Sequence, residues 1–184
     1  MYTSKASRSG VNMGSLDRIL RIIPAKKSEH LLFNLYNFNF FRRSEHGKVI
    51  MFFEGSRLVG LFMAVPYILG CELAFFGDER YFVKLKEQMT AVLVLREKPD
   101  ALFIGSLAVA PEYRRCGLAT CMLNYCARVA RRLGRSWLEL TVLKKNTPAR
   151  QLYEKAGFVK KEERKWSFVL RKSADTLENS FAGG

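Results

Sequence analysis

The segment Arg114-Arg115-Cys116-Gly117-Leu118-Ala119 has the residue types of an anion-binding loop. It follows an apolar run and opens a long helical pattern, so the first N–H groups of that helix lack intrahelical partners and point outward. Small side chains at Gly117 and Ala119 let a ligand approach the backbone, and the two arginines supply charge-assisted hydrogen bonds. The pattern indicates phosphate binding. On these six residues alone, a helix start with a solvated basic turn is equally favoured.

A second group that could take part in chemistry consists of Asn146, Arg150 and Tyr153, spaced at i, i+4 and i+7. If Asn146 starts a helix, this spacing places the three residues on one helix face. The phenol of Tyr153 can donate a proton. Taken alone, Tyr153 is better explained as a packing tyrosine with a satisfied hydroxyl.

The elements that position both groups form a strand–helix–strand–helix run. Apolar periodicity and helix-ending glycines predict a buried strand over 102–109, a helix over 118–133 ended by Gly134, a strand over 137–143, and a short helix ended by Gly157. Thr147 is expected to cap the short helix with its hydroxyl, with Pro148 in its first turn. Two final strands, 158–159 and 166–170, are expected to pair through the charged turn 161–165.

The N-terminal half carries weaker structural signals. Two β-rich runs, 48–53 and 58–65, flank the turn-forming residues 54–57 and predict an antiparallel hairpin. A helix is expected from Ser28, as its cap, through Phe40. The segment from Asp78 to about Leu95 is predicted to be helical, although its last four residues, 92–95, would equally begin a strand.

Two motifs in this order resemble those of the GNAT superfamily of N-acetyltransferases. Arg114, Gly117 and Ala119 match the pattern [QR]-x-x-G-x-[GA] after a strand. Residues 146–158 closely resemble the pattern N-x-x-A-x-x-L-Y-x-x-x-G-F. The resemblance extends over about Leu102 to Phe158. It implies an α/β (α+β) fold of the acyl-CoA N-acyltransferase type, with a mainly antiparallel central sheet flanked by helices.

The resemblance further implies acetyl-CoA as cosubstrate, bound where the strands ending near Val109 and Val142 splay apart. It assigns the pantetheine arm to the backbone of one strand and the pyrophosphate to the loop and helix start. The implied cofactor-binding residues are Leu107, Ala108, Val109, Arg114, Arg115, Cys116, Gly117, Leu118, Ala119 and Thr120, joined by Asn146 and Arg150 from the second motif. Tyr153 is implied to stand near the thioester sulfur, where it would act as the general acid.

The general base is not identified by the sequence. Some members of the superfamily carry a glutamate on the strand that corresponds to residues 103–106, and this chain has none there. Glu139 and Glu72 are candidates, but each is better explained as a solvated or salt-bridged carboxylate. A water chain to a more distant acid is equally acceptable.

The charge of the chain favours an anionic partner. It has 31 Lys and Arg against 17 Asp and Glu in 184 residues, a net charge of +14. Nucleic acid, a membrane surface and a polyphosphate ligand all fit this charge. The arginines at 128, 131, 132 and 135 are better explained as a solvated helix face than as a nucleic-acid stripe, and no nucleic-acid-binding motif accompanies them.

Composition and cysteine spacing restrict the class of protein. No apolar stretch has the length of a membrane span, and the N-terminus lacks the apolar core of a secretory signal, so a cytoplasmic protein is expected. Cys116, Cys121 and Cys126 do not share a helix face, which favours small buried thiols over a zinc site. We expect a leader over 1–14, one domain over 15–172 and a flexible tail over 173–184. A homodimer is left open.

These observations together predict an N-acetyltransferase that transfers an acetyl group from acetyl-CoA to a primary amine, by direct attack in a ternary complex. The acceptor, protein, peptide or small molecule, is not specified by the sequence. Two alternatives belong to other classes: a basic nucleic-acid- or ribosome-associated module that binds CoA without turnover, and a CoA-binding regulatory domain.

Overall fold

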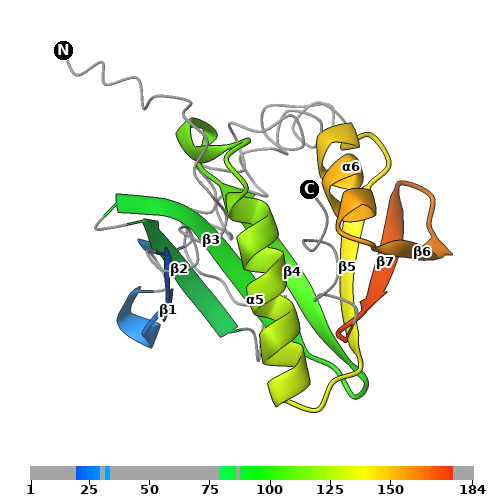
Figure 1. Ribbon diagram of the computed structural model, residues 1–184, viewed down its shortest axis with the longest axis horizontal. Helices are drawn as coiled ribbons and strands as arrows, with labels where there is room; N and C mark the ends of the chain where they lie inside the picture. Colours follow the sequence, from blue (N-terminus) through cyan, green and yellow to red (C-terminus); the bar gives the residue numbers. More distant parts are fainter. Residues whose placement is uncertain (1–19, 30–31, 34–78, 86–87, 176–184) are drawn as a thin grey trace, which may run out of the picture.

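The computed structural model describes residues 20–29, 32–33, 79–85 and 88–175. These residues contain a sheet of seven strands in the spatial order β1-β2-β3-β4-β5-β7-β6 (Figure 1). The strands are β1 (Leu20–Pro24), β2 (Glu79–Leu85), β3 (Gln88–Glu97), β4 (Ala101–Val109), β5 (Trp137–Leu143), β6 (Val159–Glu163) and β7 (Ser167–Ser173). All neighbouring strands are antiparallel except β4 and β5. The expected mixed, mainly antiparallel sheet is therefore confirmed.

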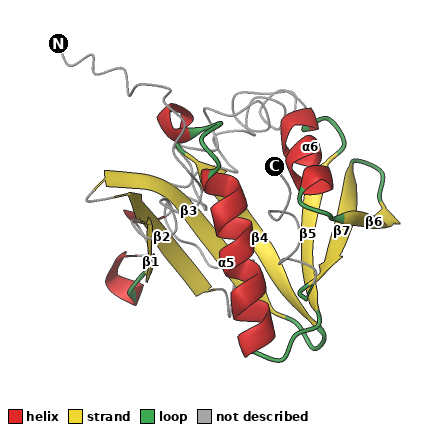
Figure 2. Ribbon diagram, in the orientation of Figure 1, coloured by secondary structure: helices red, strands yellow, loops and turns green. Residues whose placement is uncertain are grey.

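In the described part of the chain, two α-helices with defined bounds accompany the sheet (Figure 2). Helix α5 (Leu118–Arg132) runs across β4 and connects it to β5, which is the crossover that a parallel strand pair requires. Helix α6 (Thr147–Lys155) follows β5. Short 3₁₀ turns, η1 (Lys27–Glu29) and η2 (Pro111–Tyr113), complete the described elements. The predicted strand–helix–strand–helix run is confirmed. The last two strands pair as expected, but residues 161–163 of the predicted turn belong to β6.

The prediction of a helix between Asp78 and Leu95 was wrong, because β2 and β3 occupy this segment as an antiparallel pair. Most residues of both strands are buried on both sides of the sheet, including all five from Ala91 to Leu95. Strands buried on both faces lack the alternation of apolar and polar residues that marks a half-exposed strand. The sequence therefore showed neither period clearly.

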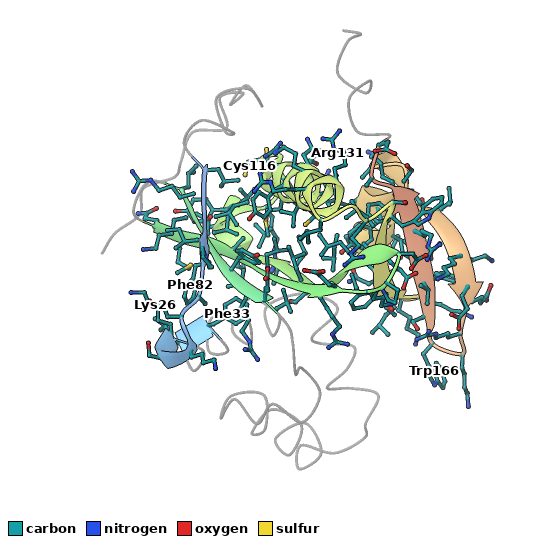
Figure 3. The ribbon with its side chains drawn as sticks, turned by 90° about the horizontal axis from the view of Figure 1, so that it is seen from below. Lys26, Phe33, Phe82, Cys116, Arg131 and Trp166 are labelled. Carbon is teal, nitrogen blue, oxygen red and sulfur yellow. The ribbon has the colours of Figure 1, made fainter. Side chains whose placement is uncertain are left out.

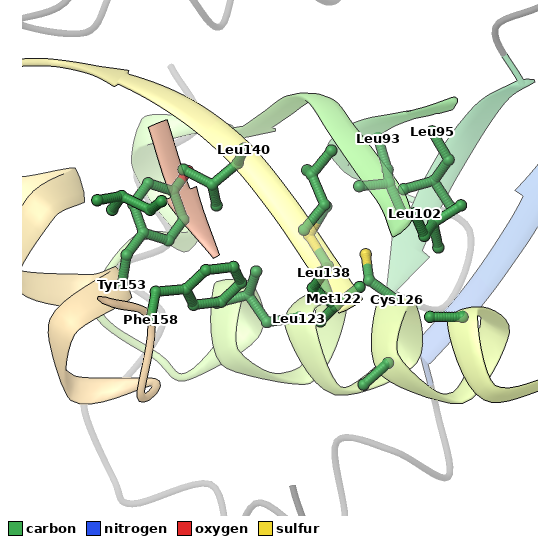
Figure 4. Close-up of a cluster of buried hydrophobic side chains, with 14 of the residues drawn as sticks. Leu93, Leu95, Leu102, Met122, Leu123, Cys126, Leu138, Leu140, Tyr153 and Phe158 are labelled. Atoms are coloured by element: carbon green, nitrogen blue, oxygen red, sulfur yellow. The ribbon is translucent and has the colours of Figure 1, made fainter. Parts of the chain in front are cut away.

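The main core lies between the sheet and α5 (Figure 4). Helix α5 buries one apolar stripe, which includes Met122, Leu123 and Cys126, against Leu138 and Leu140 of β5 and residues of β2, β3 and β4. Phe33 and Phe82 form part of a smaller cluster on the opposite face of the sheet (Figure 3). The sheet is consequently covered by apolar contacts on both faces, and α5 is fixed against β4 and β5.

The cysteines follow the expectation of buried thiols only in part. Cys121 and Cys126 are buried inside α5, whereas Cys116 is exposed and its thiol donates to the carbonyl of Tyr113 at 2.8 Å. Cys71 lies outside the described residues. Among the described residues, no cluster of His, Cys, Asp or Glu has the arrangement of a metal site. No helix in this part of the chain is long and apolar enough to cross a bilayer.

Several expectations concern residues whose structure is not described. The hairpin over 48–65 and the leader over 1–14 lie outside the described residues, as does most of the helix expected from Ser28 to Phe40. At the other end, β7 includes Ser173, and Ala174 is fully buried and donates its N–H to the carbonyl of Ser136 at 2.9 Å. The packed structure thus continues two residues beyond the expected boundary at 172.

Candidate active site

The site begins where β4 and β5 separate. Their parallel pairing covers only Ala101–Ile104 and Trp137–Leu140. One residue later, Gly105 forms a β-bulge, because the register of β3 against β4 shifts between Val94 and Leu95. A bulge bends its strand and interrupts pairing. The segment from Gly105 to Val109 therefore stays paired with β3 on one side, while its β5 side is left open.

A cleft of about 530 Å³ occupies this opening. Both strands, the loop before α5, the start of α5 and one face of α6 contribute to its wall. The lining residues are Ile104, Gly105, Ser106, Leu107, Ala108, Val109, Tyr113, Arg114, Arg115, Gly117, Leu118, Ala119, Thr120, Leu140, Thr141, Val142, Asn146, Pro148, Ala149, Gln151, Leu152, Tyr153 and Lys155. The splay between the strands near Val109 and Val142, which the resemblance implied, is present.

The start of α5 forms one end of the cleft. Gly117 is its N-cap residue with φ 82°, in the left-handed region that glycine adopts without steric cost. No side chain of the described residues caps the helix, and the first intrahelical bond is donated by Cys121 to Gly117. The N–H groups of Leu118, Ala119 and Thr120 are thus without intrahelical acceptors and lie at the cleft wall. Such a terminus attracts anions.

One backbone feature and one hydrogen bond shape the loop before α5. Arg115 has φ 64°, a conformation that non-glycine residues rarely adopt. The Nε of Arg114 donates to the carbonyl of Val109 at 3.0 Å, which ties the loop to the last residue of β4. The Arg114 side chain therefore fixes the loop to the end of β4 at this end of the cleft.

Helix α6 supplies the opposite wall and begins at Asn146. The Oδ1 of Asn146 accepts a hydrogen bond from the N–H of Ala149 at 3.3 Å, so Asn146 is the N-cap residue. The prediction that Thr147 caps this helix was wrong by one position. Pro148 lies in the first turn, as expected.

The end of α6 places Tyr153. Gly157 has φ 82°, its N–H bonds to the carbonyl of Glu154, and the N–H of Phe158 bonds to the carbonyl of Tyr153 at 2.9 Å. This is a Schellman motif, in which the third-last helical residue contacts the residue after the glycine. The rings of Tyr153 and Phe158 meet edge to face at 5.7 Å (Figure 4). The spacing Y-x-x-x-G-F is thereby explained as a device that fixes the tyrosine.

Tyr153 combines burial with access to the cleft. Only 9 % of its surface is exposed, and it lines the cleft together with Leu140 of β5. Burial raises its pKa to about 12. The phenol therefore stays protonated across the physiological range and can act as a hydrogen-bond donor or as a proton source.

Most of the residues predicted for the site come together in the cleft, and two do not line it. Cys116 is exposed and is not among the residues that line the cleft. Arg150 lies on the other side of α6, where its guanidinium donates to the carbonyl of Lys144 at 3.1 Å and stacks 5.2 Å from the ring centre of Phe168. Successive helical residues are about 100° apart, so Arg150 is about 200° around the helix from Leu152, which does line the cleft.

The lining residues that sequence reasoning missed lie on α6, on β5 and in the bulge of β4. They include Gly105, Ser106, Thr141, Gln151, Leu152 and Lys155. The positions on α6 were within reach of the sequence, because they repeat with the helical period around Leu152. The bulge at Gly105 gave no such signal beyond a glycine inside a strand pattern.

Glu139 is placed where it cannot act as the base. It lies among residues on the sheet face opposite Leu138 and Leu140 and does not line the cleft. Burial raises the pKa of its carboxyl, but hydrogen bonds from Lys161 and Lys98 outweigh that effect and lower it to about 2. Arg171 adds a third cation at 3.3 Å. Glu139 is thus the salt-bridged carboxylate that was the favoured explanation, and Glu72 lies outside the described residues.

Comparison with known proteins agrees with this geometry. The sequence profile of the acetyltransferase (GNAT) family matches residues 18–158. No curated protein matches the sequence. The fold resembles the PaiA N-acetyltransferase of Thermoplasma acidophilum, solved in complex with coenzyme A, with a TM-score of 0.61 and 14 % identity over 84 % of this chain and 98 % of that one.

Two further solved structures share the fold. A GNAT family acetyltransferase of Elizabethkingia anophelis with bound acetyl-CoA gives a TM-score of 0.58 at 14 % identity, over 84 % of this chain and 98 % of that one. The spermidine N-acetyltransferase of Vibrio cholerae gives 0.59 at 16 % identity, over 88 % and 98 %. At such identities the likeness concerns the fold, whereas the profile spans most of the chain. The protein belongs to the GNAT family of acetyltransferases, for which acetyl-CoA is the cosubstrate.

Proposed function

We propose that the protein is an N-acetyltransferase that binds acetyl-CoA in the cleft between β4 and β5 and transfers the acetyl group directly to a primary amine. The observation that carries this proposal is the composition of one continuous cleft. It has an uncapped helix N-terminus at one end, an open strand edge along its length and the protonated phenol of Tyr153 in its wall.

The residues of the cleft fit a CoA thioester. The N–H groups at the start of α5, together with Arg114 and Arg115, suit the pyrophosphate, because oriented amides and cations both stabilise negative charge. The edge of Leu107–Val109 that lies beyond the end of the β4–β5 ladder suits the amide groups of the pantetheine arm, which would extend the sheet as a further strand. Small or apolar side chains at positions such as Ala119 and Ala149 leave room for the arm.

The chemistry asks little of the side chains. As the acceptor nitrogen forms the new C–N bond, the C–S bond breaks and the sulfur needs a proton. The Tyr153 hydroxyl supplies that proton in our proposal, and solvent restores it afterwards. The acceptor nitrogen loses one proton before it attacks and a second as the amide forms. The described cleft wall contains no carboxylate and no histidine, so both protons leave through water or through a group outside the described residues.

The acceptor is proposed from charge. A protein of net charge +14 repels polycations unless its cleft is locally acidic, and no acidic residue lines the described part of the cleft. We therefore favour a peptide or protein amine, or a neutral or anionic metabolite, over polyamines. The spermidine acetyltransferase that shares the fold does not argue against this, because at 16 % identity the likeness concerns the fold alone.

Calorimetry and an amine screen test the proposal. Acetyl-CoA is titrated onto the protein at physiological salt, and a random oligonucleotide is titrated in parallel. We expect saturable acetyl-CoA binding with little oligonucleotide affinity, followed by release of free CoA when a library of amines is added. Tight oligonucleotide binding without CoA release from any amine would support a non-catalytic nucleic-acid-associated module instead.

A further inference from the structure

The Schellman motif at the C-terminal end of α6 does not satisfy the carbonyl of Ala156. The last carbonyls of any helix lack intrahelical donors. The carbonyls of Tyr153 and Glu154 accept from Phe158 and Gly157, and that of Leu152 accepts from Ala156. The carbonyl of Ala156, the C-cap residue, accepts instead from a side chain, the ammonium group of Lys172 on β7.

Lys172 is an unusual side chain for this place. It pairs with Leu138 in the register of β5 and β7, so it projects from the same face of the sheet as Leu138, toward the main core. It is only 6 % exposed, and no carboxylate among the described residues forms an ion pair with it. Burial lowers its pKa. Burying an ammonium group without an ion-pair partner destabilises the fold relative to an apolar side chain of similar size.

The buried length of Lys172 also packs against the turn that ends α6. A Cβ added at Gly157 would lie 3.4 Å from the Nζ of Lys172 and 3.6 Å from its Cε. The glycine turn, the Ala156 carbonyl and the Lys172 side chain therefore form a single packed unit. Ala156 and Gly157 follow Tyr153 by three and four residues. The next residue, Phe158, donates its N–H to the carbonyl of Tyr153, and its ring packs on the Tyr153 ring.

We propose that Lys172 is a positioning residue for the acetyl transfer: by holding the Ala156 carbonyl, it fixes the last turn of α6 and with it the phenol of Tyr153 in the cleft. The inference rests on the proposed function and extends it to a residue on β7 that lines no part of the cleft. It accounts for a buried lysine at a position where an apolar side chain would be less costly.

The test compares Lys172→Met with a control and with a double variant. Methionine keeps the length and apolar stem of the lysine but removes the donor. Lys165→Met is the matched control, because Lys165 is exposed in the β6–β7 turn and lies far from the cleft lining. Single-turnover acetyl transfer to an amine found by the screen is measured for each variant, with acetyl-CoA affinity and melting temperature measured in parallel.

We expect Lys172→Met to slow the transfer step by about 10- to 100-fold, as small misplacements of a reacting group do, while the acetyl-CoA Kd changes by less than about threefold. Lys165→Met should match the wild type. In the Tyr153→Phe background, Lys172→Met should cause no further loss beyond about twofold, because residues that act through one group are not additive. Lys172→Arg, which keeps a donor of similar reach, should restore most of the rate.

Three results would overturn the inference. The first is an unchanged transfer rate in Lys172→Met. The second is an equal loss of rate with and without the Tyr153 hydroxyl, which would show that Lys172 acts independently of it. The third is a failure of both Lys172→Met and Lys172→Gln to fold, which would make Lys172 a residue of stability. A wild-type protein that acetylates no amine would overturn the proposed function itself and is distinguishable from all three.

Discussion

Among single residues, Tyr153 is the one on which the proposed acetyl transfer depends. The sequence motif and the structure agree that it faces the cleft, and the structure adds the reason it is held there. Its ring packs on Phe158 and its carbonyl accepts from the Phe158 N–H at 2.9 Å. Burial raises its pKa to about 12, which keeps the proton on the phenol where the proposed mechanism uses it.

Tyr153→Phe should slow acetyl transfer without disturbing the site. The ring and its packing are retained, so acetyl-CoA affinity and melting temperature should change little. A general acid contributes about 10²–10⁴-fold, and a loss of this size is expected in single-turnover rate. Undiminished transfer by the Phe variant would reduce Tyr153 to a packing residue and leave the sulfur to be protonated by water.

Glycine positions at the helix ends permit a matched comparison. Gly134 and Gly157 follow α5 and α6 with φ 66° and 82°. Alanine at either position pays about 1 kcal/mol for left-handed backbone. A Cβ at Gly134 meets nothing within 4 Å, whereas one at Gly157 meets the buried Lys172 at 3.4 Å. Because 3.4 Å is an ordinary contact distance, Gly157→Ala and Gly134→Ala should lower the free energy of unfolding in urea by about the same amount. A clearly larger loss at Gly157 would show that the added methyl group displaces the Lys172 ammonium group.

At the scale of elements, the cleft results from a sheet that is tied together at one end and open at the other. The ladder between β4 and β5 ends at Ile104, and the bulge at Gly105 directs β4 away. At the paired end, Glu139 of β5 accepts from Lys98, which precedes β4, from Lys161 of β6 and from Arg171 of β7. This buried carboxylate links four segments of the chain and leaves the other end of the sheet free to splay.

Glu139→Gln should destabilise the protein in a pH-dependent way. The carboxyl pKa falls from 4.5 to about 2 on folding, so its contribution is present above about 4.5 and is lost as the pH falls toward 2. We expect a loss of about 1 to 3 kcal/mol near neutral pH, since solvent screens the half-exposed lysines. Urea titrations should show that the difference in the free energy of unfolding between wild type and Glu139→Gln decreases as the pH falls toward 2.

The control for this prediction is Glu162→Gln. Glu162 is exposed on β6 and pairs with Arg164, so its removal should leave the free energy of unfolding close to that of the wild type. The middle of the range over which the Glu139 carboxyl titrates lies at about pH 3. If the difference in the free energy of unfolding between wild type and Glu139→Gln is undiminished there, Glu139 stabilises the sheet by packing.

How far the sequence predicts these elements depends on what fixes each one. Helix α6 and its glycine turn were predictable, because caps and the Schellman motif are encoded locally. Strands β2 and β3 were not, because burial on both faces is decided by tertiary packing and erases the alternation. The position of Arg150 was misjudged for a local reason. Asn146 is the N-cap residue and precedes the helix, so the spacing from Asn146 does not define a helix face. Lys172, in a strand of mixed residues, gave no sequence signal.

At the scale of the whole molecule, charge is the strongest constraint on the acceptor. Net charge of +14 attracts anions such as CoA and disfavours polycationic acceptors. If this field selects acceptors, spermidine should be acetylated more slowly than a neutral-bodied monoamine at low ionic strength. The difference in kcat/KM should shrink as salt screens the field. A preference for spermidine that is insensitive to salt would indicate an acidic acceptor site outside the described residues.

We propose that the cleft at the start of α5 binds acetyl-CoA. Calorimetric titration of two glycine variants tests this binding. Gly117→Glu places a carboxylate at the N-cap of α5, where it blocks the approach of the pyrophosphate and repels it. Gly134→Glu is the control, because Gly134 has the same left-handed backbone at the far end of the same helix with open space around it. We expect the wild type and Gly134→Glu to bind acetyl-CoA, and we expect a folded Gly117→Glu not to bind it. Equal affinity in all three proteins would contradict this proposal.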